Sequence, residues 1–145
     1  MRKIIIINGP NLNLLGNREK NIYGDISLQE IEKKTKEKCK EMNMDLFFCQ
    51  SNNEGELINF IHLAENEYDG LIINPAALTH TSVALLDALR AISIPKIEIH
   101  LSNIYTREDY RKRSITSEGV NGLICGFGSL SYMLAIEAIN NLIKV

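Results

Sequence analysis

Glu98 and His100 are the pair of residues whose types and spacing most directly suggest acid–base chemistry. One residue separates them in the stretch Glu98-Ile99-His100, and side chains alternate across a strand, so both would face the same side of it. A carboxylate beside an imidazole fixes the tautomer of the ring and favours its protonated form. We therefore interpret His100 as a general acid that Glu98 supports. The alternative is a charged pair on a solvent-exposed strand near the edge of the sheet.

A candidate base lies in the polar segment between Gly16 and Gly24, which contains Arg18 and Tyr23. The two glycines could serve as hinges, and we predict that the segment forms a lid over the site. A nearby cation stabilises a phenolate, so a tyrosine on the same loop as an arginine can act as a base. Tyr23 could instead be a surface tyrosine that packs against its neighbours.

Amides, a second histidine and two arginines supply possible ligand contacts. The amide of Asn11 could hold a hydroxyl, a carboxylate or an ordered water, whereas we expect Asn8 to satisfy the backbone of a turn. His80 lies near the start of a predicted helix and could bind a ligand hydroxyl or local backbone. Arg107 and Arg111 are four residues apart and would share a helical face, either as a cationic patch for an anionic substrate or as a solvated surface.

The composition limits the classes of protein to be considered. The chain has 145 residues, of which 45% are hydrophobic and 23% charged, as is typical of one soluble globular domain over residues 1–145. A net charge of −2 provides no broad basic field, so we expect neither nucleic acid nor a membrane as a partner. The three cysteines lack CxxC spacing, and we expect them to be buried thiols in a cytoplasmic protein.

Short apolar runs alternate with helical patterns along the whole chain, which predicts an α/β fold. The expected strands are residues 3–7, 46–50, 70–74, 96–100 and 120–125, and the expected helices are residues 28–42, 55–65, 81–92 and 130–143. Residues 101–117 are polar and are predicted to be loop with some helix. Right-handed crossovers favour a flavodoxin-like three-layer sandwich, with a five-stranded parallel sheet in the order 2-1-3-4-5. Ligands of such folds bind at the carboxyl ends of the strands.

Several motifs, taken in their order and spacing, resemble the type II 3-dehydroquinate dehydratase family over the full length of the chain. They are NGPNLNLLG at 8–16, Arg18 followed by Tyr23-Gly24, QSNxEGEL at 50–57, LTHTS at 78–82, IEIHLSN at 97–103 and RxxS at 111–114. The resemblance implies a flavodoxin-like subunit that converts 3-dehydroquinate to 3-dehydroshikimate by anti elimination of water, through an enolate. This reaction belongs to the shikimate pathway or to quinate breakdown.

The resemblance also implies catalytic roles for five residues. Tyr23 would take the proton from the carbon beside the ketone, while Arg18 stabilises the phenolate and the developing enolate. Asn11 would help to hold a water that hydrogen-bonds the enolate oxygen. His100 would protonate the departing hydroxyl, and Glu98 would orient His100. These roles agree with the need of such an elimination for a base, an acid and stabilisation of an oxyanion.

Substrate binding is implied for a further set of residues. Asn74 and the backbone of Leu101 and Ser102 would bind the substrate carboxylate. His80 and Arg111 would bind the ring hydroxyls.

The resemblance further implies a homododecamer, built as a tetramer of trimers, that uses neither a metal nor an organic cofactor. Asp87 would reach the site of a neighbouring subunit. The sequence departs from common family choices at Ala76, where glycine is frequent, at Leu78, and at Lys20 of the lid. These departures put the rate and the affinity in question, but not the class of reaction.

A noncatalytic flavodoxin-like binding module is the competing interpretation. A phospho-receiver domain needs acidic residues after its first strand and at the end of its third, where this sequence has Asn8 and Asn74. A nucleotide or flavin carrier needs a phosphate-binding loop, and the loop at 8–16 has neither glycine-rich pattern. The sequence therefore favours the enzyme.

Overall fold

A computed structural model describes residues 1–17, 20–23 and 25–144, and for Lys20 and Tyr23 it describes the backbone only. Two of the predicted catalytic side chains, those of Arg18 and Tyr23, thus lie outside the described part. Within that part, no helix is both long enough and apolar enough to span a bilayer.

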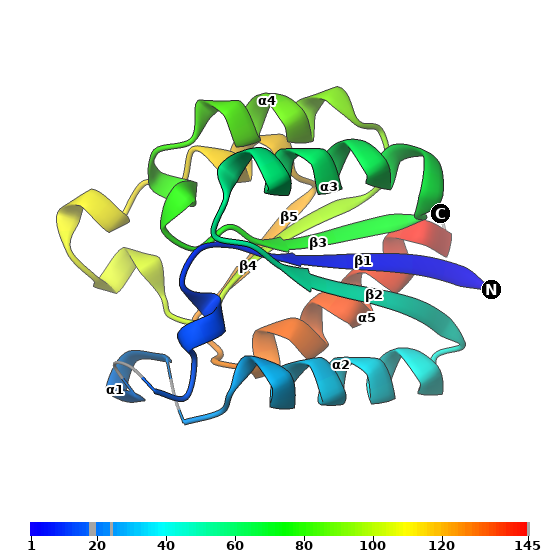
Figure 1. The fold of residues 1–145 in the computed structure, drawn as a ribbon, viewed down its shortest axis with the longest axis horizontal. Coiled ribbons are helices and arrows are strands. Elements are labelled where there is room, and N and C mark those ends of the chain that lie inside the picture. The colour runs from blue at the N-terminus through cyan, green and yellow to red at the C-terminus, as the bar shows by residue number, and fades with distance from the viewer. Residues whose placement is uncertain (18–19, 24, 145) are drawn as a thin grey trace.

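A five-stranded parallel sheet in the order β2-β1-β3-β4-β5 forms the centre of the molecule (Figure 1). Its strands are β1 (Arg2–Asn8), β2 (Met44–Gln50), β3 (Gly70–Asn74), β4 (Lys96–His100) and β5 (Gly122–Cys125). Both the strands and their order confirm the sequence prediction. The second strand begins two residues earlier than predicted because Met44 is buried and pairs with Arg2, and the fifth begins two residues later, at Gly122.

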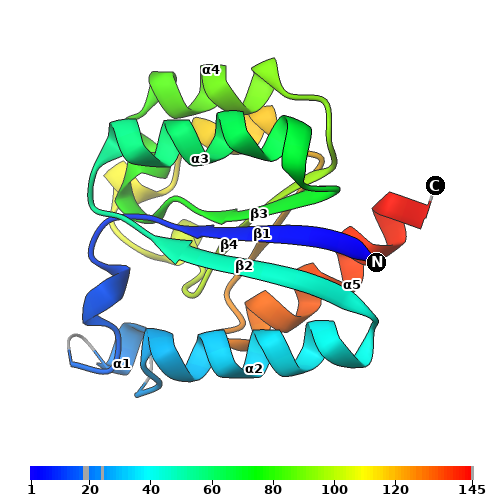
Figure 2. The ribbon, with the colours of Figure 1, turned by 45° about the vertical axis from the view of Figure 1, so that its right-hand side comes forward.

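Four long helices cover the two faces of the sheet. They are α2 (Leu28–Glu41), α3 (Glu54–Glu67), α4 (Val83–Ala91) and α5 (Leu130–Lys144). Figure 2 shows α3 and α4 on one face and α2 and α5 on the other. The side chains of β1 alternate between these layers: Ile5 and Ile7 pack with the residues of α3 and α4, and Ile4 and Ile6 with those of α2 and α5. Burial on both faces explains why this strand is apolar throughout.

Side-chain caps set where these helices begin. The hydroxyl of Ser27 accepts from the Glu30 backbone N–H at 3.2 Å, as in a capping box. The third predicted helix starts at Val83 rather than at residue 81, because the Ser82 hydroxyl accepts from the Leu85 backbone N–H at 2.9 Å.

Short helical segments fill the connections at the carboxyl ends of the strands. They are η1 (Leu12–Leu14), α1 (Lys20–Tyr23), η2 (Ala76–His80), η3 (Ile104–Thr106), η4 (Asp109–Arg111) and η5 (Thr116–Gly119). The prediction of loop with some helix over residues 101–117 is confirmed. Most of the predicted site residues lie on these segments or on the strand ends beside them.

The cysteines are free thiols. Burial raises the pKa of Cys39 to about 11 and that of Cys49 to about 12. A thiol that stays protonated is a poor nucleophile. Cys39 is buried as expected, whereas Cys49 and Cys125 are only half-buried, so the expectation of buried thiols is confirmed for Cys39 alone.

Candidate active site

A cavity of about 120 Å³ lies at the carboxyl ends of β1, β3 and β4. Most of the predicted site residues line it: Asn11, Asn74, His80, His100, Leu101, Ser102 and Arg111. The order of the sheet explains this convergence, because β1, β3 and β4 are adjacent and end on the same side.

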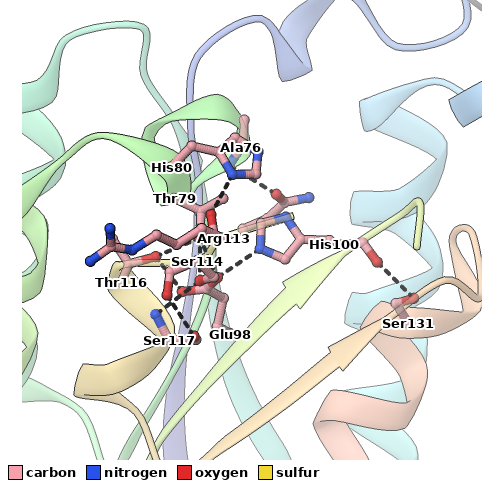
Figure 3. A network of polar contacts seen from close by, with 11 residues as sticks. Ala76, Thr79, His80, Glu98, His100, Arg113, Ser114, Thr116, Ser117 and Ser131 are labelled. Atoms are coloured by element: carbon pink, nitrogen blue, oxygen red, sulfur yellow. Dashed lines mark hydrogen bonds and ion pairs between the residues drawn. The ribbon is translucent and has the colours of Figure 1, made fainter. Parts of the chain in front are cut away.

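Glu98 and His100 form a buried pair at the wall of this cavity (Figure 3). Their side chains face the same side of β4, and Nε2 of His100 lies 2.7 Å from Oε2 of Glu98. Glu98 is fully buried and His100 is only 5% exposed. The alternative of a solvent-exposed strand is therefore wrong, because β5 covers the edge of β4 and loops close over its end.

The carboxyl of Glu98 is stabilised in its charged form. Burial alone would raise its pKa, but the hydrogen bond and positive charge of His100, with hydrogen bonds from Thr116 and Thr79, hold the pKa below its usual value. An ionised carboxylate only accepts hydrogen bonds, so Nε2 of His100 carries the shared proton. Nδ1 is then the ring nitrogen that can serve a ligand.

Three hydroxyl residues, Thr79, Ser114 and Thr116, surround the Glu98 carboxylate. Sequence reasoning did not single them out, although Thr79 and Ser114 fall inside the LTHTS and RxxS motifs. Thr79 lies 35 residues before Ser114, and only the folded chain brings it and the Ser114–Thr116 stretch to one carboxylate.

Asn74 belongs to a second buried chain of polar groups. Its Nδ2 donates to the hydroxyl of Tyr132 at 3.2 Å, and that hydroxyl donates to Oδ1 of Asn8 at 2.6 Å. Nδ2 of Asn8 donates to the Cys49 carbonyl at 2.9 Å. Asn8 was expected to satisfy a turn; instead it joins β1 to β2 and to α5. Burial raises the pKa of the Tyr132 hydroxyl, which therefore remains a neutral donor.

The side-chain oxygen of Asn74 accepts from the Ala76 backbone N–H at 3.1 Å. This turn places Ala76 at φ 53°, a left-handed conformation that favours glycine. The frequent glycine at this family position thus has a conformational explanation, and alanine here is strained.

His80 contacts the backbone and also borders the cavity. Its Nδ1 lies 2.7 Å from the Arg113 carbonyl oxygen, so Nδ1 is the donor and Nε2 is left to accept or to meet a ligand. The two interpretations of His80 are therefore compatible: Nδ1 binds the backbone, and Nε2 can still bind a ligand.

Arg107 and Arg111 both line the cavity, but not from one helical face. Arg107 follows η3 and Arg111 ends η4, and Glu108 lies between them. Nε of Arg111 is 2.9 Å from Oε2 of Glu108, and Nε of Arg107 is 3.8 Å from the same oxygen. The prediction of a shared helical face is wrong because residues 104–111 form two separate turns. The placement of Arg107 in the lining agrees with the alternative of a cationic patch at the site, although the family resemblance assigned this residue no role.

A second, wider hollow adjoins this cavity and shares Leu101, Ser102 and Arg107 with it. Asn21 and Ile22 of α1 also line this hollow. The segment predicted to be a lid thus borders the region next to the cavity.

Asp87 and Asn11 are both exposed, but they differ in their relation to the cavity. Asp87 is exposed on α4, and the described residues that line the cavity do not include it. Asn11 is exposed at φ 70°, and its backbone N–H donates to Oδ1 of Asn52 at 2.9 Å. Asn11 nevertheless lines the cavity.

Comparisons with known proteins agree with this geometry. A family model described as dehydroquinase class II matches residues 2–140. A 3-dehydroquinate dehydratase of Thermoanaerobacter pseudethanolicus is 52% identical over 96% of this chain and 94% of its own length. One of Clostridium botulinum (strain Okra) is 52% identical over 99% of both chains. The crystal structure of a type II dehydroquinase from Butyrivibrio crossotus superposes with a TM-score of 0.94, at 47% identity, covering 96% of this chain and 97% of that one.

Proposed function

The chain belongs to the dehydroquinase class II family and dehydrates 3-dehydroquinate, and we propose that the cavity at the strand ends is where water is eliminated. The observation that carries the proposal is the buried Glu98–His100 pair, with its 2.7 Å contact, at the wall of that cavity. A carboxylate-supported imidazole can deliver a proton to a departing hydroxyl. The competing idea of a noncatalytic binding module is set aside, because relatives over 99% of the chain are named as the dehydratase.

On the base side, Tyr23 removes the proton from the carbon beside the ketone, and Arg18 stabilises the phenolate and the enolate that forms. Both side chains lie outside the described part of the chain. Support comes from the Arg18 and Tyr23-Gly24 motif, and from Asn21 and Ile22, which border the hollow next to the cavity. The amide of Asn11 holds the water that hydrogen-bonds the enolate oxygen.

On the acid side, Nδ1 of His100 faces the leaving hydroxyl while Nε2 donates to Glu98. As the enolate electrons return to form the ketone and a new carbon–carbon double bond, the carbon–oxygen bond breaks. The hydroxyl takes the His100 proton and departs as water. Glu98 does not touch the substrate; it holds the ring by accepting from Nε2 and so orients Nδ1.

The polar groups that line the cavity are assigned to the polar groups of the substrate. Asn74 and the backbone N–H groups of Leu101 and Ser102 receive the carboxylate, and the ring hydroxyls meet His80 and Arg111. The Tyr132 hydroxyl supports this assignment, because it engages one N–H of the Asn74 amide and so fixes which way the amide points.

The working assembly is a homododecamer, a tetramer of trimers, in which Asp87 of one subunit completes a neighbour's site. The exposed position of Asp87 on α4, outside its own cavity, supports this. Co-expression of Asp87→Ala with Tyr23→Phe, each weak alone, should restore turnover because some mixed sites contain both native residues. Mixed oligomers verified by native mass spectrometry that give only the average of the parents would overturn the shared site.

Residues 1–145 act as one catalytic domain in the cytoplasm, without a metal or an organic cofactor. Dialysis of the purified protein against a chelator should therefore leave kcat unchanged.

The proposed site is tested by following the ultraviolet absorbance of the enone formed from 3-dehydroquinate. The native protein should turn over, and Tyr23→Phe should fold but lose about 10²–10⁴-fold in kcat, the usual contribution of a general base. Retention of more than half the activity by Tyr23→Phe would remove Tyr23 from the mechanism.

A further inference from the structure

The Glu98 carboxylate receives more polar contacts than its pairing with His100 requires (Figure 3). Its Oε2 lies 2.6 Å from the Thr79 hydroxyl and 3.0 Å from the Ser114 hydroxyl, and its Oε1 lies 2.5 Å from the Thr116 hydroxyl. Thr79, Thr116 and Glu98 are all fully buried. We call Thr79, Ser114 and Thr116 the hydroxyl cage.

The hydroxyls of the cage also contact one another. Oγ1 of Thr79 is 2.6 Å from the Ser114 hydroxyl and 2.8 Å from that of Thr116. Each hydroxyl has a single proton to donate. An arrangement that serves the shortest contacts has Ser114 donating to Thr79, while Thr79 and Thr116 donate to the two carboxylate oxygens. The Ser117 backbone N–H donates to the Ser114 hydroxyl oxygen at 3.1 Å. The proton of the Ser114 hydroxyl can then be donated to Thr79.

The cage joins segments that are far apart along the chain. Thr79 lies in η2, Thr116 begins η5, and Ser114 lies between η4 and η5. The Ile115 backbone N–H donates to the Thr79 carbonyl at 2.6 Å, which fastens two of these segments together beside Glu98. Among the described residues, those that line the cavity do not include the three cage residues. The cage therefore acts on the substrate indirectly, and its contacts with Glu98 lead to His100 in the lining.

Neutral donors have a particular consequence for a buried carboxylate. A lysine or arginine in their place would compensate the burial of the charge but would also neutralise it. Hydroxyl groups compensate the burial by hydrogen bonding and leave the negative charge available to the imidazolium. They also fix the rotation of the carboxylate, so that Oε2 stays directed at Nε2 of His100.

We propose that Thr79, Ser114 and Thr116 are positioning residues for the dehydration, which hold Glu98 as an oriented carboxylate and thereby keep His100 aligned for proton transfer. This inference rests on the proposed role of His100 as the acid. It adds three residues that act on the chemical step without touching the substrate.

The test replaces Thr79 and Thr116 by valine, which has the same shape without the hydroxyl, and by serine, which keeps it. Each valine variant should lose roughly 10–100-fold in kcat, the range for removing a partner that orients a functional histidine, with KM within about two-fold of native because the cavity lining is unchanged. The serine variants should recover most of kcat. Ser117→Ala is the matched control, because the Ser117 hydroxyl donates to the Ser114 carbonyl at 3.2 Å and not to Glu98.

A spectroscopic measurement separates positioning from a general loss of structure. The Nε2 proton of His100, shared with a carboxylate at 2.7 Å, should give a downfield, exchange-protected proton resonance, assigned by its absence in His100→Asn. The resonance should persist in the serine variants and in Ser117→Ala, and should shift upfield or broaden in the valine variants. Should a valine variant fail to fold, Ser114→Ala provides the same comparison at a half-buried position.

Three results would overturn the positioning role: valine variants that keep more than half of kcat, serine variants no better than valine, or a Ser117→Ala loss equal to that of the cage. Failure of the native protein to dehydrate 3-dehydroquinate would instead overturn the proposed function, so the two failures are distinguishable.

Discussion

Both ends of the central sheet carry polar side chains that pair within the chain, but the two ends use them differently. At the amino end Lys96 is buried, whereas Asn121 and Asp69 are exposed. Nζ of Lys96 donates to the Ile92 carbonyl at 2.6 Å, and the Asn121 side chain accepts from the Lys96 backbone N–H at 2.8 Å. Likewise Asp69 accepts from the Lys3 backbone N–H at 2.8 Å. Each of these contacts joins a side chain to backbone and so ties a strand to a loop beside it.

At the carboxyl end, buried side chains pair mainly with other side chains. Glu98 contacts His100 and the hydroxyl cage, and Tyr132 links Asn8 to Asn74. His100 contacts Glu98 and Asn74 contacts Tyr132, and both His100 and Asn74 also line the cavity. Burial of a polar residue is thus a weak sign of function by itself. A polar residue fixed by a buried partner and directed at a cavity is a stronger one.

The largest expected effect is at the acid. His100→Asn keeps a polar side chain at the strand end but has no proton to deliver, so kcat should fall about 10²–10⁴-fold. His62→Asn, on the exposed face of α3, is the matched control and should stay near native. The enone absorbance measures both. Equal activity of the two variants would show that His100, at the carboxyl end of the sheet, is not needed for the reaction.

Glu98→Gln should have the next largest effect, on stability and its pH dependence. The substitution leaves donors without a charged acceptor, and the free energy of unfolding should drop by about 1–3 kcal/mol at neutral pH. Because the folded pKa of Glu98 is lowered, its stabilising contribution is present above the unfolded value near 4.3 and is lost as pH falls through the folded value. Urea unfolding across this range should show the two proteins converging in acid. A constant difference down to low pH would contradict the pairing described here.

Arg111→Ala should weaken substrate binding more than it slows the chemical step. A hydrogen bond to a charged group is worth about 1.5–3 kcal/mol, so KM should rise roughly 10–100-fold with a smaller change in kcat. Arg90→Ala is the control, because Arg90 lies on α4 and, among the described residues, does not line the cavity; its ion pair to Glu118 is 3.9 Å long. A loss confined to kcat would instead place Arg111 in the chemical step.

The smallest effect on activity should come from the amino end. Lys96→Met removes a buried cation far from the cavity, and kcat/KM should stay within about two-fold. Burial lowers the pKa of Lys96, so the folded state penalises its charged form below the folded pKa, and the penalty disappears above the unfolded value near 10.4. The stability of the methionine variant relative to native should therefore decline as pH rises toward that value. A large loss of activity would show that the two ends of the sheet are coupled.

The sequence correctly predicted the position of site residues that lie on the strands. Alternation along β4 was enough to put Glu98 beside His100, and the strand order was enough to bring Asn74 to the same cavity. Both inferences depend only on strand geometry and parallel pairing, which are local and regular.

Contacts between distant segments were not predictable in this way. Tyr132 reads as one more apolar position of an amphipathic helix, yet its hydroxyl meets Asn8, 124 residues away. Threonine and serine are common in turns, so nothing in their spacing separates Thr79 and Thr116 from residues that cap a helix. Arg107 was weighed with Arg111, but the irregular turns over 104–111 do not follow a helical period.

The proposed division of labour between Tyr23 as base and His100 as acid is most directly tested by deuterium exchange. In D₂O, the His100→Asn protein should still remove and return a hydrogen at the carbon beside the ketone, so 3-dehydroquinate should gain deuterium there faster than product forms. Nuclear magnetic resonance measures both rates, with a sample lacking enzyme as the background. Incorporation above background with slow dehydration is the predicted result. Loss of exchange together with dehydration would contradict the assignment of His100 to the second, protonating step alone.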